Sequence, residues 1–434
     1  MIKEKSDKIE REKILKKLSK VKMSSIRSSD DKKSNIELGR ELDLYIVNEV
    51  IGHGLPLFTP KGTIIKQELE NFVTKEEKKR GYLYTSTPVM AKSDLYKISG
   101  HWQHYKDDMF TLDVNGKNFA LRPMTCPFQF ALYKRKPRTY HDLPKKYAEI
   151  ATLFRKEKSG ELRGLTRMSQ FALADGHVIC EESQVEKEFI KVMEFVDFII
   201  ETFGIGIEYR FSKWDPLNNN GKYVDNPEAW EKTENMMRSI MNNLKIDFVE
   251  EEGEAAFYGP KLDLQFKDIY GKEDTLLTIQ IDFALPEKFD MSFLNREGEQ
   301  ETPFIIHRSA LGCIERMISY LLEKTQGNLP LWLSPVQVKV LSCGEKSDSY
   351  AKGIYDNLLM NDIRCEVDLS SKSIGKKIRN ASMEKICYVV VVGDKEEEDE
   401  SISVRVRDSD DIDGLKLDEF VEKVKEEIKL RIRK

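Results

Sequence analysis

The sequence predicts an α/β protein with two domains: a larger α+β domain built on an antiparallel sheet flanked by helices, and a smaller α/β domain with a mixed, mostly parallel sheet. Three patterns carry this prediction. Residues 154–177, FRKEKSGELRGLTRMSQFALADGH, read as a strand, a polar loop and a second strand. Residues 183–204 place apolar side chains at helical spacing. After residue 336, strand and helix patterns alternate, which is typical of parallel strands with helices on both faces.

The first 36 residues form a charged N-terminal extension. Ile9, Ile14, Leu15 and Leu18 are spaced as in a short amphipathic helix, and a linker rich in Ser, Asp and Lys follows. The alternative is a solvated tail with no special role. Acidic residues are interspersed among the basic ones and no apolar core follows, so the segment does not resemble a targeting peptide.

Residues 37–330 contain the helices and strands expected for the larger domain. Ser183 should cap the helix over 183–204, and Gly204 should end it. The other patterns in this part predict helices over 38–47, 63–80 and 307–324 and strands over 82–88, 115–124, 146–155, 167–180, 256–266 and 276–284.

Residues 331–434 form the smaller domain, which begins within a linker marked by two prolines in NLPLWLSPV, residues 328–336. The acidic run at 396–400 is expected to be a hairpin loop. The patterns predict, in chain order, a strand over 337–343, a helix over 350–361, a strand over 364–369, a helix over 374–384, strands over 387–394 and 401–408, and a helix over 417–433.

Composition limits the class of protein. The 434 residues are 40% hydrophobic and 33% charged, as in soluble globular proteins. The net charge of −5 gives no overall attraction to nucleic acid, so any RNA site must be a local basic patch. No apolar run approaches the ~20 residues of a membrane helix. Six scattered cysteines without a CxxC pair favour a reducing compartment, and we expect a cytoplasmic protein.

Residues 154–177 carry polar groups on one face of their strands, because side chains at i, i+2 and i+4 point the same way. The residues that share this face are Arg155, Glu157, Arg167, Ser169, Phe171, Leu173, Asp175 and His177. Such groups suit a binding floor rather than a core. Guanidinium groups match phosphate oxygens, so we expect a nucleoside triphosphate here. The sequence has no GxxxxGK[ST] loop and no GxGxxG after a strand, so neither common nucleotide fold applies.

Several motifs resemble those of the class II aminoacyl-tRNA synthetases. FRKE followed by RMSQF is similar to their motif 2, ALGCIERMISYLL at 310–322 to motif 3, and TSTPVM with Pro88 to motif 1, the dimer element. From about residue 37 to the C-terminus, the chain closely resembles the threonyl-tRNA synthetase family through the segments GRELDLYIV, TPKGTII, SGHWQHYKDDMF, LRPMTCP, SGELRGLTR, AFYGPKLD, TIQIDFALP, IHRSALG and LWLSPVQV. Motif 2 or motif 3 alone would be a weak signal, whereas this many ordered matches is a strong one.

The resemblance implies a threonine–tRNA ligase. ATP would activate threonine to threonyl-adenylate, and the threonyl group would pass to the 3′-terminal adenosine of threonine tRNA. It also implies a class II catalytic domain over 37–330, an anticodon-binding domain over 331–434 and a homodimer formed through motif 1.

A zinc ion is implied by the same resemblance, with Cys126, His177 and His307 as its ligands. Taken alone, Cys126 would be read as a buried apolar residue and the two histidines as structural. Three protein ligands leave an open coordination position, which threonine's amine and hydroxyl can use. A site that must bond a hydroxyl rejects valine by a factor of ~10⁴ or more, whereas serine keeps the hydroxyl.

The family match also assigns contacts to both substrates. Asp175 would accept a hydrogen bond from the threonine hydroxyl, and Tyr258 would contact the amine. For ATP with Mg²⁺, the implied contacts are Arg155 on the α-phosphate, Glu157 on the adenine amino group, Phe171 and Arg316 on the two faces of the adenine ring, Arg167 on the distal phosphates, and Gln280 and Lys261 as further polar contacts.

The smaller domain would read the anticodon. By position, Glu396 and Arg405 match family residues that contact anticodon bases, and Ser371 and Lys385 fall at contact positions whose usual residues differ. A basic cluster could meet phosphates, or could be a solvated helix face; it consists of Lys372, Lys376, Lys377 and Arg379.

The chain departs from the family in places. The domain that hydrolyses mischarged seryl-tRNA is not in this sequence, so we expect no editing in cis. Serine errors would then be cleared by a separate trans-editing protein or tolerated. The departures within the motifs are Phe128 and Gln129 for Gly-His, Leu173 and Ala174 for Gln-Asp, Gly176 for Ala, Thr275 in a segment that usually carries Trp-Gln, and Cys313 for Ser. The lost glutamine at Leu173 should alter contacts to the carboxylate and the α-phosphate.

Two other functions stay open at this point. A non-catalytic, synthetase-like module could hold tRNA, but it predicts a damaged ATP site, and the ATP residues are intact. A synthetase-like enzyme could load an amino acid onto another acceptor, but it should lack the anticodon domain.

Overall fold

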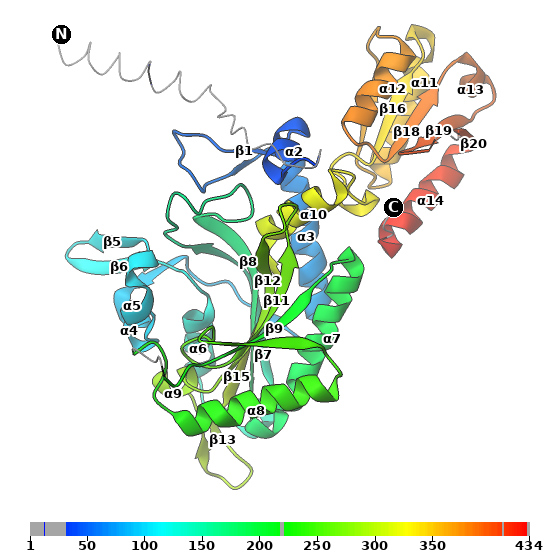
Figure 1. Ribbon diagram of the computed structural model, residues 1–434. Coiled ribbons are helices and arrows are strands. Elements are labelled where there is room, and N and C mark those ends of the chain that lie inside the picture. Colours follow the sequence, from blue (N-terminus) through cyan, green and yellow to red (C-terminus); the bar gives the residue numbers. More distant parts are fainter. Residues whose placement is uncertain (1–12, 14–31, 218–220, 410–411, 432–434) are drawn as a thin grey trace, which may run out of the picture. The chain divides into compact units, whose positions relative to one another are not determined.

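The computed structural model describes Lys13 and residues 32–217, 221–409 and 412–431. These residues divide into two compact units (Figure 1). The first contains Val47–Pro56 and Glu70–Tyr320, and the second contains residues 32–46, Leu57–Leu69 and 321–431. The N-terminal helix expected over residues 9–18 lies outside the described residues, apart from Lys13, and the predicted domain boundaries stay predictions. None of the helices described is long and apolar enough to cross a bilayer.

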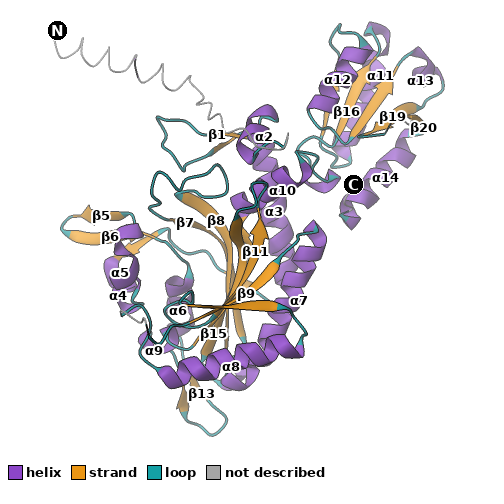
Figure 2. Cartoon of the chain, in the orientation of Figure 1, coloured by secondary structure: helices purple, strands orange, loops and turns teal. Residues whose placement is uncertain are grey.

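An eight-stranded sheet forms the centre of the first unit (Figure 2). Its inner pairs are antiparallel, as predicted, and only the outermost pairs at each edge are parallel. In spatial order its strands are β10 (Phe248–Glu252), β9 (Glu208–Lys213), β11 (Lys261–Lys267), β12 (Glu273–Asp282), β15 (Phe304–Cys313), β8 (Gln170–Cys180), β7 (Lys145–Phe154) and β3 (Leu83–Tyr84).

The register of three central strands gathers polar residues from distant parts of the chain. His177 on β8 pairs with Tyr147 on β7 and with His307 on β15. The pairing of β15 with β8 shifts between Ser309 and Cys313, where Gly312 has a φ of 70°. Strand β15 therefore places His307 opposite His177, and it ends at Cys313, directly before the helix that begins at Ile314.

The longer helices of the first unit are α7 (Val185–Phe203) and α8 (Pro227–Asn243), together with parts of α3 (Pro60–Lys79) and α10 (Ile314–Thr325), whose residues up to Leu69 and from Leu321 belong to the second unit. Helix α7 packs on β15 and contacts α8 (Figure 1). It ends at Gly204, which is left-handed with a φ of 61°, as predicted. Its N-cap residue is Gln184, not Ser183, because a 3₁₀ turn over Glu182–Gln184 precedes it.

The helix predicted over 307–324 is wrong in its first part, because residues up to Cys313 belong to strand β15. The run IIHRSALGC is almost continuously buried, and a buried run shows no period that separates a strand from a helix. The helix predicted over 38–47 is also too long, since only Asn35–Glu41 is helical and Tyr45–Ile46 forms strand β1.

Shorter elements complete the first unit. The strand expected over 115–124 is a hairpin strand in a three-stranded sheet. The short elements are β4 (Met90–Lys92), β5 (Thr111–Val114), β6 (Lys117–Leu121), β13 (Phe293–Leu294), β14 (Gln300–Glu301), α4 (Ser93–Ile98), α5 (His101–Tyr105), α6 (Cys126–Lys134) and α9 (Leu285–Lys288).

The second unit contains a five-stranded mixed sheet. The order across the sheet is β17 (Cys365–Asp368), β16 (Val338–Ser342), β18 (Tyr388–Val392), β19 (Ile402–Val406) and β20 (Ile412–Leu415); of these, β17, β16 and β18 pair in parallel, and β19 pairs antiparallel with both β18 and β20. Its helices are α11 (Asp348–Met360), α12 (Ile374–Met383), α13 (Asp394–Glu398) and α14 (Leu417–Leu430); the unit also holds α2 (Asn35–Glu41), β1 (Tyr45–Ile46) and β2 (Leu57–Phe58).

Both faces of this sheet are covered by helices, as the alternating pattern predicted. One core packs α11 and α14 on residues such as Val340 and Val390, and the other packs α12 on Leu341 and Val389. Consecutive strand residues therefore serve opposite cores. The acidic run at 396–400 lies, as predicted, in the connection between two antiparallel strands, β18 and β19, but its first part is helical because helix α13 includes it.

Candidate active site

One pocket of about 340 Å³ opens on the large sheet and is lined from β8, β11, β12, β15, α10 and the loops beside them. All the residues predicted to contact ATP, threonine or metal line it, namely Cys126, Arg155, Glu157, Arg167, Phe171, Asp175, His177, Tyr258, Lys261, Gln280, His307 and Arg316. The alternation in residues 154–177 is confirmed for Phe171, Leu173, Asp175 and His177, which line the pocket together, whereas Ser169, assigned to the same face, is not among the lining residues.

Cys126, His177 and His307 form a cluster at one end of this pocket. One ligand atom of each lies within 4.8 Å of the others, and all three residues are buried. Cys126 begins α6, while the histidines sit opposite each other on β8 and β15. The two imidazole centroids are 4.6 Å apart and their planes are nearly perpendicular.

The donor set of this cluster fits a metal ion such as zinc. A buried thiol and two imidazoles are zinc ligands, and three of them leave a fourth position open. Burial, followed by the neighbouring histidine charge, lowers the pKa of His177 well below its usual value, which keeps its imidazole neutral as a metal ligand must be. Burial raises the pKa of the Cys126 thiol, so metal binding would have to displace its proton.

The ring of each histidine is oriented by a hydrogen bond to a neighbouring side chain. His307 Nε2 lies 2.7 Å from Asp282 Oδ2, and His177 Nδ1 lies 2.6 Å from Gln129 Oε1. Each bond uses one ring nitrogen and leaves the other for the cluster. The sequence reading missed both partners, although Asp282 lies two residues after Gln280 on the same strand face.

Asp175 and Tyr258 lie beside the cluster. Asp175 is buried on β8, and its burial raises the pKa of its carboxyl group. The Tyr258 ring stacks on His307 with centroids 5.0 Å apart, and its hydroxyl donates to Gln280 Oε1. These groups can recognise a small polar molecule at the open side of a metal.

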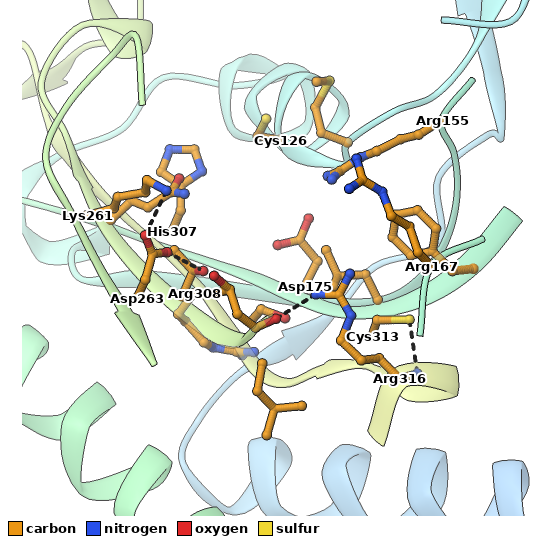
Figure 3. A pocket seen from close by; sticks show the side chains of 18 of the residues that line it. Cys126, Arg155, Arg167, Asp175, Lys261, Asp263, His307, Arg308, Cys313 and Arg316 are labelled. Atoms are coloured by element: carbon orange, nitrogen blue, oxygen red, sulfur yellow. Dashed lines mark hydrogen bonds and ion pairs between the residues drawn. The ribbon is translucent and has the colours of Figure 1, made fainter. Parts of the chain in front are cut away.

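Three arginines occupy the other end of the pocket, and Figure 3 shows them across Asp175 from His307. The Arg155 guanidinium lies 5.3 Å from the Phe171 ring centroid. Desolvation, and then repulsion from Arg316, lowers the pKa of Arg155. The positive charges of both arginines therefore face the same part of the pocket. Arg167 contacts Glu157 at 2.8 Å. This end can bind a polyanion beside an aromatic surface.

Backbone carbonyls hold Arg316 in place. Its Nε donates to Thr166 O at 3.0 Å and its Nη1 to Thr275 O at 2.6 Å. The departure at Thr275 leaves this anchor intact, because any residue offers the same carbonyl. Lys261 is paired with Asp263 at 2.7 Å (Figure 3). Asp263, two residues along the same strand face, was not predicted.

Two other departures meet in the structure. Leu173 on β8 and Cys313 on β15 are register partners and both line the pocket, so a polar pair of the family is replaced by a less polar patch. Gly176 is explained by Arg308: a Cβ there would lie 2.5 Å from the guanidinium carbon of Arg308, a buried residue paired with Glu77.

The predicted anticodon residues are dispersed over the second unit. Ser371 is exposed, Lys385 is left-handed just after α12, Arg405 lies on β19, and the Glu396 carboxylate accepts hydrogen bonds from Gly393 N and Ser403 Oγ. Lys377 of the basic cluster cannot meet phosphates, because it is buried and its ammonium donates to the Ser342 and Asp368 carbonyls. The other members of that cluster are largely exposed.

Comparison with known proteins agrees with this geometry. The tRNA synthetase class II core domain (G, H, P, S and T) matches residues 105–325, and an anticodon binding domain matches residues 337–427. A crystal structure of the RNA binding domain of threonyl-tRNA synthetase from Cryptosporidium parvum Iowa II superposes with a TM-score of 0.87 at 33% identity, over 91% of this chain and 98% of that one. This chain belongs to the threonyl-tRNA synthetase family of class II synthetases.

Other family members give the same picture. A putative threonyl-tRNA synthetase from Aeropyrum pernix superposes with a TM-score of 0.81 at 30% identity, over 92% of this chain and 97% of that one. A threonine–tRNA ligase of Clostridium botulinum (strain Eklund 17B / Type B) is 53% identical over 402 residues, which are 92% of this chain and 62% of that protein. The chain thus spans about three fifths of the length of the curated family members it matches.

Proposed function

We propose that this chain is a threonine–tRNA ligase that activates threonine with ATP and transfers it to the 3′-terminal adenosine of threonine tRNA. The observation that carries the proposal is the arrangement of one pocket. A metal-binding cluster with Asp175 occupies one end and Arg155, Arg167 and Arg316 occupy the other. An amino acid held at the first end would present its carboxylate to a phosphate held at the second.

At the threonine end, Cys126, His177 and His307 would hold a zinc ion. Bound there, zinc would offer an open coordination position to the amine and hydroxyl of threonine. Asp175 accepts the hydrogen bond of the hydroxyl, and Tyr258 contacts the amine. Gln280 positions Tyr258 through the hydrogen bond between their side chains. Valine has no hydroxyl for Asp175, which is then left buried without that partner.

At the ATP end, Arg155 binds the α-phosphate and stabilises the charge that grows as the threonine carboxylate attacks and pyrophosphate leaves. Arg316 and Phe171 stack on the adenine ring, and Glu157 accepts a hydrogen bond from its amino group. Arg167, together with Mg²⁺, binds the distal phosphates. Lys261 supplies a further positive charge, which Asp263 holds in place.

The remaining parts of the proposal concern partners. Glu396, Arg405, Lys385 and Ser371 would contact the anticodon of the tRNA, a homodimer would form through the segment around Pro88, and the protein would work in the cytoplasm. Support comes from the anticodon binding domain matched over residues 337–427 and from the family membership.

The direct test is aminoacylation. The purified, zinc-loaded chain is incubated with ATP, Mg²⁺, radiolabelled threonine and either threonine tRNA or a tRNA for another amino acid. Label should appear only on threonine tRNA. Adenylate formation without transfer to threonine tRNA would contradict the ligase assignment and leave amino acid activation as the function.

A further inference from the structure

We propose that Gln129 is a positioning residue that fixes His177 as a metal ligand, through a one-directional chain of hydrogen bonds that starts at a buried ion pair. The inference rests on the proposed metal site and adds a residue that the proposed mechanism does not use. Gln129 is wholly buried and does not line the pocket, so it cannot touch the substrates.

Helix α6 presents three functional side chains on one face. Cys126, Gln129 and Phe130 are separated by three and four residues, the spacing of helical neighbours. Cys126 joins the cluster, and Gln129 reaches the ring of His177. The Phe130 ring meets His177 and His307 edge-on, with centroids at 5.7 Å and 6.0 Å. One helix thus supplies a ligand and confines both imidazoles.

The chain of hydrogen bonds begins at Glu149 on β7. Its carboxylate is buried and paired with the Arg122 guanidinium at 2.9 Å. The Thr87 hydroxyl also lies within hydrogen-bond distance of this carboxylate. Thr85 Oγ1 donates to the second carboxylate oxygen at 2.9 Å, with the Ala148 carbonyl at 3.4 Å as its other acceptor. Among the described residues, these two oxygens are the acceptors to which Thr85 Oγ1 donates.

The direction of the next bonds follows from that arrangement. Because the Thr85 hydroxyl has given its proton to an acceptor, it can only accept from Gln129, whose Nε2 lies 2.8 Å away. The amide of Gln129 is then fixed, with its Oε1 facing His177 Nδ1 at 2.6 Å. His177 must carry its proton on Nδ1, and the lone pair of Nε2 is left for the metal.

The opposite amide orientation would block the site. It would turn the Gln129 NH₂ group toward Nδ1, which would then have to accept, so the imidazole proton would move to Nε2. His307 needs no such reference, because Asp282 is a carboxylate and can only accept from His307 Nε2. The Gln129 amide, by contrast, could take either of two orientations. Its bond to Thr85, whose hydroxyl donates to the carboxylate of the ion pair, selects one of them.

The test measures zinc affinity, by competition with a chromogenic chelator, and the melting temperature of the metal-free protein. Gln129→Leu should weaken zinc binding by about 10–100-fold. Gln129→Glu keeps an acceptor toward His177 and should stay within a few-fold of wild type. The matched control is Gln337→Leu, since Gln337 is a buried glutamine bonded to Leu331 O and Arg364 N in the second unit; it should lower the melting temperature and leave zinc affinity unchanged.

A second readout follows the tautomer without metal. In protein labelled with ¹⁵N-histidine, which has only six histidines, His177 should carry its proton on Nδ1 and His307 on Nε2. Thr85→Val or Gln129→Leu should convert His177 into a mixture of tautomers and leave His307 unchanged.

Two outcomes would overturn the inference. Equal zinc affinity in wild type and Gln129→Leu would make Gln129 a packing residue and leave the proposed function intact. A wild-type chain that binds no zinc would remove the metal site itself, and this inference with it.

Discussion

The Cys126 thiol is the ligand whose replacement tests the metal site most cleanly. Cys126→Ser changes one atom and replaces a soft sulfur donor by a poor one. We expect zinc to be lost on dialysis and threonine activation to be abolished, as measured by metal content and by pyrophosphate exchange. The control is Cys180→Ser, another buried cysteine on β8 outside the pocket, which should keep its zinc. Full activity of the metal-free Cys126→Ser protein would refute the site.

Arg155 is expected to act on the reaction rather than on folding. Its guanidinium opens to the pocket and lies over the Phe171 ring. Among the described residues it forms no ion pair, so its removal leaves no partner carboxylate unpaired. Arg155→Ala should lower the rate of ATP–pyrophosphate exchange by about 100-fold or more, because one donor to the developing charge is lost. Arg210→Ala, which removes a surface ion pair with Glu273, should leave exchange unchanged. A large fall in melting temperature for Arg155→Ala alone would assign it a structural role.

At the scale of single residues, the sequence and the family resemblance indicated which side chains line the pocket, but not the hydrogen bonds that hold those side chains in place. The alternation on β8 placed Phe171, Asp175 and His177 on one face, because a strand has a fixed period. Cys126 and His307 are far from His177 in the chain, so only the family resemblance could join them. Gln129 was noticed merely as a departure, since a hydrogen bond between a helix and a strand leaves no periodic signal.

Among the elements, the end of β15 requires a glycine at position 312. Gly312 has a left-handed φ of 70°, and a Cβ there would lie 2.2 Å from the Leu276 carbonyl oxygen. Gly312→Ala should lower the free energy of unfolding by about 1–3 kcal/mol and displace the start of α10, which carries Arg316. The measurement is the urea midpoint, read beside Gly206→Ala, where a Cβ meets nothing within 4 Å. Equal midpoints for the two variants would contradict the strain.

Elements with a clear sequence period were predicted well. Helix α7 and the strands β7 and β8 lie within a few residues of their predicted bounds. Helix α7 has apolar residues at helical spacing and ends at Gly204, and β8, although almost wholly buried, carries Asp175 and His177 at alternate positions. Strand β15 was assigned to a helix because it is buried along almost its whole length. Helix α13 was missed because its run of acidic residues resembles a solvated loop.

For the whole molecule, we expect threonine activation and tRNA recognition to depend on different residues. Arg405 lies on β19, and in the described part of the chain its guanidinium has no hydrogen bond or ion pair. Arg405→Ala should therefore weaken tRNA charging and leave adenylate formation intact. Arg407→Ala is the structural comparison, because Arg407 donates to the Leu329 and Lys385 carbonyls, and it should lower the melting temperature. Loss of both reactions in Arg405→Ala would show that Arg405 is structural.

The two-part organisation was the easiest feature to predict. A change from antiparallel to alternating patterns at a proline-marked linker predicted two sheets, and a class II core and an anticodon binding domain are matched in that order along the chain. The exact domain boundaries stay predictions. Leu57–Leu69 nevertheless belongs to the second unit, which no local pattern in that segment indicates.

The proposed use of the pocket is best tested by ATP–pyrophosphate exchange with the zinc-loaded protein, measured with threonine, serine and valine side by side. We expect exchange with threonine, weaker exchange with serine, and exchange with valine lower than with threonine by a factor of ~10⁴, because valine cannot offer a hydroxyl to the metal and Asp175. Exchange with valine at the rate of threonine, or no exchange with any of the three, would contradict this use of the pocket.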